Sequence, residues 1–289
     1  MAPPLVILGC GFVGGHLARA AAAAGRTVRA CARSTGRMAP LAALGVDVKY
    51  LDVAITAKIA PTISGLHGAT VLYAVPPIGT LRPGQAVRAA LQAAYGIGAN
   101  CFIYLSSSGL YGDKPDDEVW IDEDTPLQVD PGMANVKSDE EEIARNEFER
   151  LRTCVLRLAP VYAPGRGIRA RLRKGDYRLL DDGEHAISRI YLDDLLTVIA
   201  AAEDRAPASS LYLVADDEPT TQREYATWLC ERMGLPLPAS RSLYEPGGSR
   251  VAHRNRKIRN TKLRTELAIE LRYPTFREGE LAIEAAEAV

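Results

Sequence analysis

The chain has little of what marks secreted, zinc-binding or membrane-spanning proteins. Its 289 residues include five cysteines, which are widely spaced and form no Cys-x-x-Cys pair. This spacing argues against a disulfide framework or a zinc site and favours a reducing, cytoplasmic setting. No apolar run reaches the roughly 18 residues that cross a bilayer, and the N-terminus lacks the basic start of a signal peptide. The sequence therefore predicts no membrane segment. Because the four histidines also lack metal-ligand spacing, it predicts no metal site either.

An excess of charge of one sign is also absent. The 35 lysines and arginines stand against 36 aspartates and glutamates, which gives a formal net charge of −1. Such a balance gives no surface-wide attraction for nucleic acid or membranes, so a small-molecule substrate is the expected partner. Two local runs stand out. The basic run 249–264 is expected to form a solvated or substrate-facing helix, and the acidic run 138–142 is expected to lie on a solvated helical face.

Short apolar runs alternate with alanine-rich, helix-forming stretches through the first 160 residues. Six of these runs and one later run are predicted to be strands: 5–8, 27–31, 46–51, 70–75, 101–106, 153–158 and 211–215. Apolar strands separated by helices predict an α/β fold with a doubly wound parallel sheet. After residue 160 the rhythm loosens, and there Thr221 and Glu224 form a capping-box pattern that predicts a helix ending at Gly234.

A glycine motif directly follows the first predicted strand. In "LGCGFVGG", Gly9, Gly11 and Gly14 have the spacing G-x-G-x-x-G and lead into a helix. The first glycine permits a tight turn, the second lets the backbone approach a pyrophosphate, and the third allows close packing of helix and strand. The start of the helix offers N–H groups and a partial positive charge to phosphates. The motif in this context predicts a dinucleotide-binding site.

The end of the second predicted strand indicates which dinucleotide is bound. An NAD site has a carboxylate about 20 residues past the glycine motif, but here Arg33 and Ser34 follow the strand, with Arg37 nearby. A guanidinium pairs bidentately with a 2′-phosphate, so NADP(H) is favoured over NAD(H). Asp52, after the third strand, is either a hydrogen-bond acceptor for the adenine amino group or a carboxylate that serves only its own turn.

Several motifs, taken in order, resemble one family. "GCGFVGGHL", "YLSSSGLYG", "VLRLAPVYAPGRG" and "SRIYLDDL" together resemble the extended short-chain dehydrogenase/reductase superfamily, also called the NAD-dependent epimerase/dehydratase family, and the tail resembles its atypical members. The resemblance implies a Rossmann domain over residues 1–160. Most of residues 161–289 would then form a smaller C-terminal substrate lobe, with 189–215 returning to the sheet. Many members pair through two helices beside the sheet, which allows a homodimer.

The resemblance also places a catalytic set, from which one member is missing. The family uses a serine after the fifth strand and a Tyr-x-x-x-Lys helix, and these positions fall on Ser107, Met133 and Lys137. A tyrosine next to a lysine donates a proton to the alkoxide that hydride transfer leaves, while the serine orients the carbonyl. Methionine has no proton to donate.

Three interpretations follow from the missing phenol. The favoured one is a reductase with another proton donor, for which Ser107, Tyr111, Tyr162, Lys137, the more distant Tyr191 and a bound water are candidates. The others are an epimerase or dehydratase variant, and a non-catalytic NADP(H)-binding regulator or redox sensor. The reductase is favoured because a sensor needs no hydroxyl aimed at a substrate, and two prolines beside the expected nicotinamide position favour an apolar or aromatic carbonyl compound.

The expected site residues form three groups. The catalytic candidates are Ser107, Lys137 and Tyr111. The expected cofactor contacts are Gly9, Gly11, Phe12, Val13, Gly14, Arg33, Ser34, Asp52, Val53, Ala74, Val75, Lys137 and Pro160. The expected substrate contacts are Pro76, Ser108, Met133, Tyr162 and Arg189.

Overall fold

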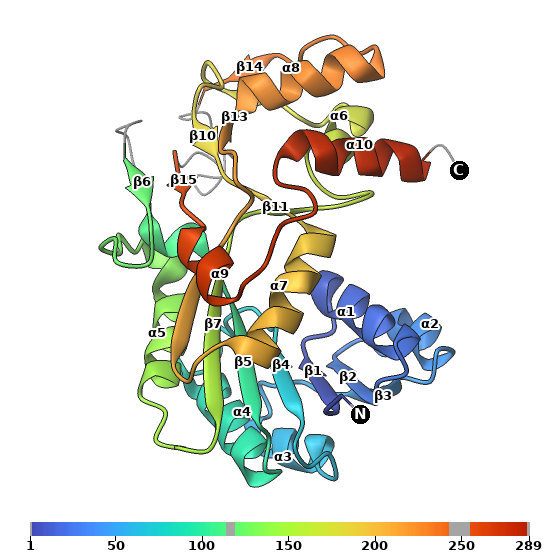
Figure 1. The fold of residues 1–289 in the computed structure, drawn as a ribbon, viewed down its shortest axis with the longest axis vertical. Helices are drawn as coiled ribbons and strands as arrows, with labels where there is room; N and C mark the ends of the chain where they lie inside the picture. The colour runs from blue at the N-terminus through green and yellow to red at the C-terminus, as the bar shows by residue number, and fades with distance from the viewer. Residues whose placement is uncertain (1, 114–118, 243–254, 288–289) are drawn as a thin grey trace. The chain divides into compact units, whose positions relative to one another are not determined.

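A computed structural model of the chain describes residues 2–113, 119–242 and 255–287 (Figure 1). The chain forms two compact units, each built from several segments. The first unit contains Met1–Ser107, Asp130–Arg157 and Ile199–Tyr212. The second contains Ser108–Val129, Leu158–Val198 and Leu213–Val289.

A seven-stranded sheet forms the centre of the first unit. Its strands are β1 (Leu5–Leu8), β2 (Val28–Ala32), β3 (Asp47–Tyr50), β4 (Thr70–Tyr73), β5 (Cys101–Ser107), β7 (Arg152–Leu158) and β12 (Ser210–Val214). The strand order is β12-β7-β5-β4-β1-β2-β3, and β1 to β5 pair in parallel. The predicted doubly wound sheet is therefore confirmed, with strand ends shifted by at most two residues. The order reverses at β1, which lies between β4 and β2, and such a reversal opens a crevice at the carboxyl ends of the strands.

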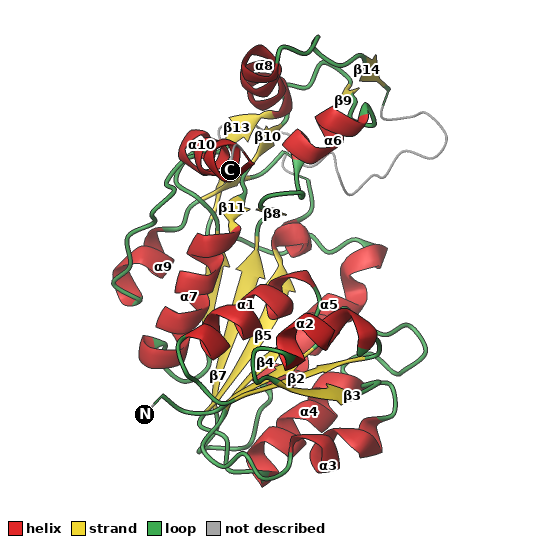
Figure 2. Ribbon diagram, turned by 90° about the vertical axis from the view of Figure 1, so that its right-hand side faces the viewer, coloured by secondary structure: helices red, strands yellow, loops and turns green. Residues whose placement is uncertain are grey.

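Helices cover both faces of this sheet (Figure 2). On one face, apolar residues of α3 (Ile59–Ile63), α4 (Gln85–Gly96) and α5 (Ala134–Ala144) join a buried cluster with alternate strand residues such as Val6 and Leu8. The opposite face of β1 presents Ile7, against which Gly14 of α1 (Phe12–Ala23) packs. The alternation of side chains along β1 thus explains why α1 lies on the other side.

The second unit contains short strand pairs and helices. β8 (Val161–Tyr162) pairs in parallel with β11 (Ile190–Tyr191), and β10 (Ala186–Ile187) pairs antiparallel with β13 (Thr220–Thr221). The further short strands β6 (Trp120–Ile121) and β9 (Leu179–Leu180) pair with β15 (Lys257–Ile258) and β14 (Ser240–Arg241). The helices described here are α6 (Ile168–Lys174), α8 (Gln222–Met233), α9 (Thr261–Glu266) and α10 (Phe276–Glu287), while α2 (Ala39–Ala42) lies in the first unit and α7 (Leu192–Arg205) belongs to both. The predicted helix is confirmed with its N-cap, because the Thr221 side chain accepts a hydrogen bond from the Glu224 N–H and Gly234 is the C-cap that follows Met233. The Glu224 carboxylate accepts from the Thr220 hydroxyl and not from the Thr221 N–H of a full capping box.

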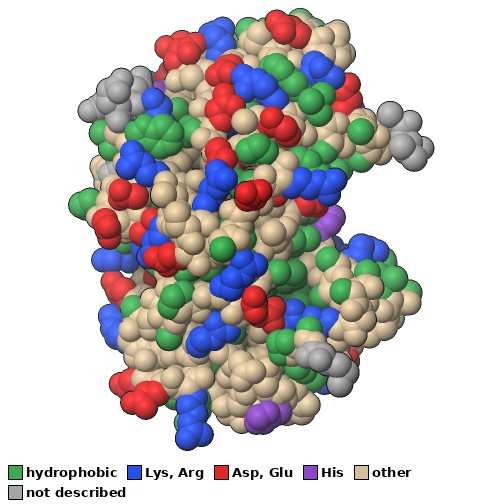
Figure 3. Space-filling view, in the orientation of Figure 1, with side chains coloured by type: hydrophobic (Ala, Val, Ile, Leu, Met, Phe, Trp, Pro, Cys, Tyr) green, Lys and Arg blue, Asp and Glu red, His purple; other side chains and the backbone are tan. Residues whose placement is uncertain are grey.

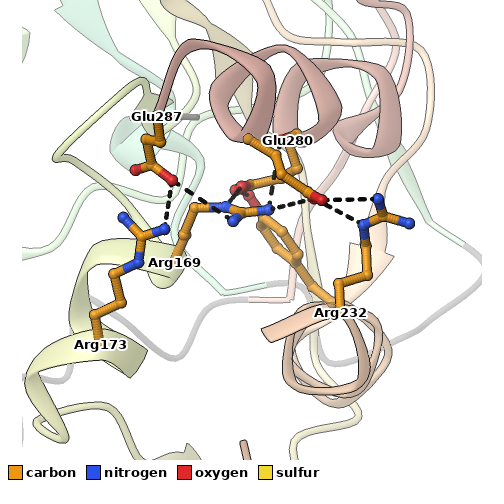
Figure 4. Close-up of polar contacts among 7 residues, drawn as sticks. Arg169, Arg173, Arg232, Glu280 and Glu287 are labelled. Carbon is orange, nitrogen blue, oxygen red and sulfur yellow. Dashed lines mark hydrogen bonds and ion pairs between the residues drawn. The ribbon is translucent and has the colours of Figure 1, made fainter. Parts of the chain in front are cut away.

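A buried polar network holds three helices of the second unit together (Figure 4). Arg169 of α6 donates to Glu280 of α10 at 2.6 Å, and their side chains are only 5% and 1% exposed. The Tyr225 hydroxyl of α8 donates to the same carboxylate. Around this centre, Arg232 pairs with Glu284 at 2.9 Å and Arg173 with Glu287 at 2.5 Å. The helices of this unit are joined by charge as well as by apolar packing.

The two charged runs differ from expectation. The acidic run was predicted to be solvated, and for Asp139 and Glu140 this is wrong, since they are 5% and 8% exposed. The basic run does not form one helix, because residues 255–264 include β15 and the start of α9, while residues 249–254 lie outside the described part of the chain. On the face drawn in Figure 3, acidic and basic side chains are interspersed. Within the described residues, no helix is long and apolar enough to cross a membrane.

Candidate functional site

The first unit contains a pocket of about 1020 Å³ at the carboxyl ends of β1, β2 and β4. Ten of the residues expected to contact the cofactor or substrate line it: Gly9, Gly11, Phe12, Arg33, Ser34, Asp52, Val53, Ala74, Val75 and Pro76. The glycine turn lies in the middle of the pocket, because β1 stands between β2 and β4. Val13, Gly14 and Lys137 belong to the same unit but are not among the lining residues, and Pro160 belongs to the second unit.

The three motif glycines have distinct physical roles in the turn. Gly9 has a φ of +93°, and a Cβ there would lie 2.7 Å from the Ala74 backbone, so only glycine fits. A Cβ at Gly14 would lie 2.9 Å from Ile7 Cγ2 and from the Gly9 carbonyl, so this glycine lets α1 pack on β1. A Cβ at Gly11 would meet only one atom, the Gly9 oxygen at 4.0 Å. Gly11 therefore leaves open space at the floor of the pocket.

Helix α1 presents its start and one side to the pocket. The Gly15 N–H donates to the Gly11 carbonyl at 2.8 Å, which closes the first helical turn. The N–H groups of Val13 and Gly14 belong to the first turn, whose N–H groups have no acceptor within the helix, and they carry the positive end of the helix dipole. Phe12, His16 and Arg19, at spacings of four and three residues, lie on the side that lines the pocket.

The charge of the pocket lining is positive. Arg19, Arg33 and Arg37 line it together with a single carboxylate, Asp52. One oxygen of that carboxylate accepts the Ala54 N–H at 3.0 Å, so Asp52 stabilises its own turn and also faces the pocket. Neither Arg19 nor His16 was predicted from the sequence as a site residue. Both residues lie at helical spacing from Phe12, and this spacing is the signal that could have identified them.

The family's catalytic positions in the first unit lie on β5 and α5. Ser107 ends β5, and its neighbour Ser106 donates to Glu140 at 2.5 Å. Lys137 has a side chain that is 48% exposed, and its Nζ lies 3.3 Å from Glu141. Met133 is half-buried at the start of α5. None of these residues is among those that line the pocket of the first unit.

The expected residues of the second unit are buried. Tyr111 has no exposed surface and packs in a cluster with Ile121, Leu213 and Ile258. Ser108 is 2% exposed, and its carbonyl accepts a hydrogen bond from Arg256 at 3.3 Å. In this conformation neither side chain is open to a ligand.

Tyr162 and Arg189 belong to a buried polar cluster that also contains Asp216. The Tyr162 hydroxyl, the Arg189 Nη1 and both Asp216 carboxylate oxygens are buried and have no hydrogen-bond partner within the described part of the chain. The Arg189 guanidinium lies 4.3 Å from the centre of the Tyr225 ring. Burial raises the pKa of Asp216 well above its usual range, and the nearby Arg189 opposes this only in part. The sequence gave no sign that Asp216 joins these two residues.

A glycine turn between strand and helix, at the reversal point of a doubly wound parallel sheet, defines the Rossmann class of nucleotide-binding folds. The family model of the NAD dependent epimerase/dehydratase family matches residues 5–215. The chain belongs to this family.

Solved structures with the same fold cover almost the whole chain. A conserved protein of unknown function from Silicibacter pomeroyi is 28% identical, with a TM-score of 0.84 and 99% of each chain covered. A protein from Methylobacillus flagellatus, provisionally described as an NAD-dependent epimerase/dehydratase, is 26% identical, with a TM-score of 0.77 and 100% of each chain covered. DesIV, a dTDP-glucose 4,6-dehydratase from Streptomyces venezuelae solved with NAD and TYD, is 18% identical, with a TM-score of 0.81. The match covers 99% of the present chain and 97% of DesIV. A comparison with curated protein sequences finds no match.

Proposed function

We propose that the chain is an NADP(H)-dependent oxidoreductase that reduces a carbonyl group of a small molecule. The observation that carries this proposal is the composition of the pocket. A glycine turn and a helix start lie beside Arg19, Arg33 and Arg37, and the one carboxylate of the lining already accepts a backbone N–H. A ligand with several phosphate charges complements this lining.

The residues of the pocket fit such a dinucleotide. The space beside Gly11 admits a pyrophosphate close to the backbone, and the start of α1 stabilises its charge. Arg33, at the end of β2, would hold the 2′-phosphate, with Ser34 beside it. Asp52, after β3, has one oxygen left for the adenine amino group. Bound NADPH supplies the hydride that the reaction needs.

The proton must come from a group other than a tyrosine at position 133. Ser107 is the group that would orient the substrate carbonyl. Lys137 pairs with Glu141 across one helical turn at a half-exposed site, and such pairs are weak, so the ammonium is able to turn toward a bound ligand. The burial of Tyr111 gives it less support as a donor than Ser107, Lys137 or a bound water.

A second candidate function is an NADP(H)-binding regulator without turnover. It is favoured by one specific observation. Among the described residues that line the dinucleotide pocket, none is a family catalytic position or one of the tyrosines considered as donors. The epimerase or dehydratase alternative is consistent with the family, but it relies more heavily on the phenol that Met133 replaces.

Calorimetric titration with NADPH and NADH, followed by a panel of aldehydes and ketones, separates these functions. The reductase predicts tighter binding of NADPH and turnover of at least one carbonyl compound. Tight NADPH binding without turnover, together with activity that appears only in Met133→Tyr, would assign the protein to the regulator class. No uptake of either dinucleotide by folded protein would overturn the proposal as a whole.

A further inference from the structure

One wall of the dinucleotide pocket is a proline-rich segment that follows β4. Residues 76–80 of this segment line the pocket, and the segment reaches α4 at Gly84. Pro76, Pro77 and Pro83 each fix one backbone φ angle and lack an N–H donor, which stiffens the segment. The strand order places this wall on the opposite side of β1 from Arg33 and β2.

The back of this wall is not fully packed. A cavity of about 10 Å³, close to the size of one water molecule, lies behind it and is lined by Pro77, Ile78, Asn135 and Asp139 among others. Side-chain packing therefore leaves the wall room to shift. The wall is held at one end by β4, where the Ala74 N–H donates to the Leu8 carbonyl at 2.8 Å, and its far end near Gly84 needs an anchor of its own.

That anchor is a carboxylate from the acidic run of α5. Asp139 is 5% exposed and lies beside the backbone N–H of Gly84, which stands at the start of α4 and lines the same small cavity. The Tyr104 hydroxyl of β5 donates to the Asp139 Oδ2 at 3.1 Å. Gly84 has a φ of +77°, and a Cβ there would overlap the Glu142 side chain, so the turn packs directly against α5. The wall is thus tied to the sheet through Gly84, Asp139 and Tyr104.

We propose that Asp139 is a positioning residue for the dinucleotide pocket, because its ionised carboxylate holds the wall of residues 76–80 in the place where the cofactor binds. This inference rests on the proposed NADP(H) function. An ionised acceptor binds N–H and O–H donors about twice as strongly as a neutral one. Loss of the charge therefore loosens the wall without unfolding the protein.

The charge of Asp139 responds to mild acid. Burial raises the pKa of Asp139 to about 6, the Tyr104 and Gly84 hydrogen bonds oppose this, and the neighbouring carboxylates Glu140 and Glu142 add to it. Tyr73 of β4, whose own pKa is raised by Asp139, also faces it, and Arg82 and Asn135 line the small cavity with it. The carboxylate is ionised above pH 6, so the wall is held most firmly there.

The test is the dissociation constant of NADPH, measured by calorimetry from pH 5 to pH 8 in wild type, Asp139→Asn and Tyr104→Phe. We expect Asp139→Asn to bind about three- to tenfold more weakly at pH 8, the effect of losing charge assistance in one or two hydrogen bonds. The wild-type affinity should fall more steeply toward pH 5 than that of Asp139→Asn. Titration of the ligand phosphate is common to all variants, so the difference between the two profiles isolates Asp139.

Tyr104→Phe separates positioning from a merely structural role. The hydrogen bond from Tyr104 favours the ionised form of Asp139. Removing the Tyr104 hydroxyl should therefore move the midpoint of the affinity profile to higher pH. Glu147→Gln, which removes a charge from an exposed site shortly after α5, should leave the profile unchanged. Superimposable profiles for wild type and Asp139→Asn would overturn the inference. An absence of NADPH binding in the wild type at pH 8 would instead count against the proposed function.

Discussion

At the scale of single residues, Gly9 and Gly11 stand in one turn but need to be glycine for different reasons. Gly9 is required by the fold, because its φ is +93° and a Cβ would overlap the Ala74 backbone. Gly11 has an ordinary φ of −89° and open space around it. A Cβ at Gly11 therefore meets no protein atom closer than 4.0 Å, whereas one at Gly9 overlaps the protein backbone.

We expect Gly11→Ala to leave the melting temperature within about 2 °C of wild type while it weakens NADPH binding at least tenfold, an effect of about 1.4 kcal/mol. Gly9→Ala should lower the free energy of unfolding by about 1–3 kcal/mol, the cost of a strained backbone. Thermal melts and calorimetry on both variants provide the measurement. Equal losses of stability in the two variants would contradict this division of roles.

In the proposed function, Arg33 is the residue that would decide between NADPH and NADH. Arg33→Ala should raise the dissociation constant of NADPH about 10- to 100-fold, as expected for about 1.5–3 kcal/mol of charge-assisted hydrogen bonding. Binding of NADH should change by less than about threefold, because NADH has no 2′-phosphate. Arg145→Ala is the matched control, since Arg145 is an exposed arginine of α5 that pairs with Glu141 and Glu142. A parallel loss for both dinucleotides would assign Arg33 to the pyrophosphate instead.

At the scale of elements, helix α5 is held to the sheet by a buried ion pair. Glu140 accepts bonds from Arg157 of β7 at 2.6 Å and from Ser106 of β5 at 2.5 Å, and the two charged side chains are 9% and 7% exposed. A buried charge without its partner is costly, so this pair fixes which face of α5 meets the sheet. Met133 and Lys137 take their positions from that arrangement.

Glu140→Ala should lower the free energy of unfolding by about 3–5 kcal/mol, because it leaves the Arg157 guanidinium buried and unpaired. Ser106→Ala removes one neutral donor and should cost about 1 kcal/mol. Glu141→Ala, on the exposed side of the same helix, should change the stability by less than about 0.5 kcal/mol. Urea unfolding at pH 7.5 measures all three. A Glu140→Ala variant as stable as Glu141→Ala would show that the ion pair does not hold the helix.

At the scale of the whole molecule, buried carboxyl groups control how stability varies with pH. Burial raises the pKa of Glu123, Asp139, Asp194, Asp216 and Glu280. The acids with a lowered pKa are Asp47, Glu278 and Glu284, each of which accepts side-chain hydrogen bonds. Because the pKa of these buried carboxyl groups is raised in the folded state, the folded protein holds protons that the unfolded chain has already released.

We therefore expect the protein to lose stability as the pH rises from about 4 to about 6. One pKa unit corresponds to about 1.4 kcal/mol, so Asp139 alone, with a pKa of about 6, accounts for about 2–3 kcal/mol of this loss. Melting temperatures at pH 5 and pH 7 measure it, and Asp139→Asn should show a smaller difference. Stability and NADPH affinity should then respond to acid in opposite directions. A wild-type melting temperature higher at pH 7 than at pH 5 would contradict the expectation.

The sequence by itself determined the local features. The strand runs, the spacing of Gly9, Gly11 and Gly14, the absence of a carboxylate after β2 and the Thr221 cap each depend on a few neighbouring residues. Backbone sterics and short-range hydrogen bonds act at that range, and for this reason the pattern was sufficient to predict the sheet and the glycine turn. The prediction that residues 161–289 hold the substrate stays a prediction.

Tertiary structure decided which polar side chains are buried. Asp139 and Glu140 look like members of a solvated acidic run, and only the packing of α5 against β5 and β7 places them inside. Asp216 likewise joins Arg189 through a backbone hydrogen bond of 2.6 Å between residues far apart in the chain. An ionised side chain is buried at low cost only where a partner from another element offsets its lost hydration, as Arg157 does for Glu140, and the sequence around it does not contain that partner. The Asp216 carboxylate has no hydrogen-bond partner within the described residues, and burial instead raises its pKa.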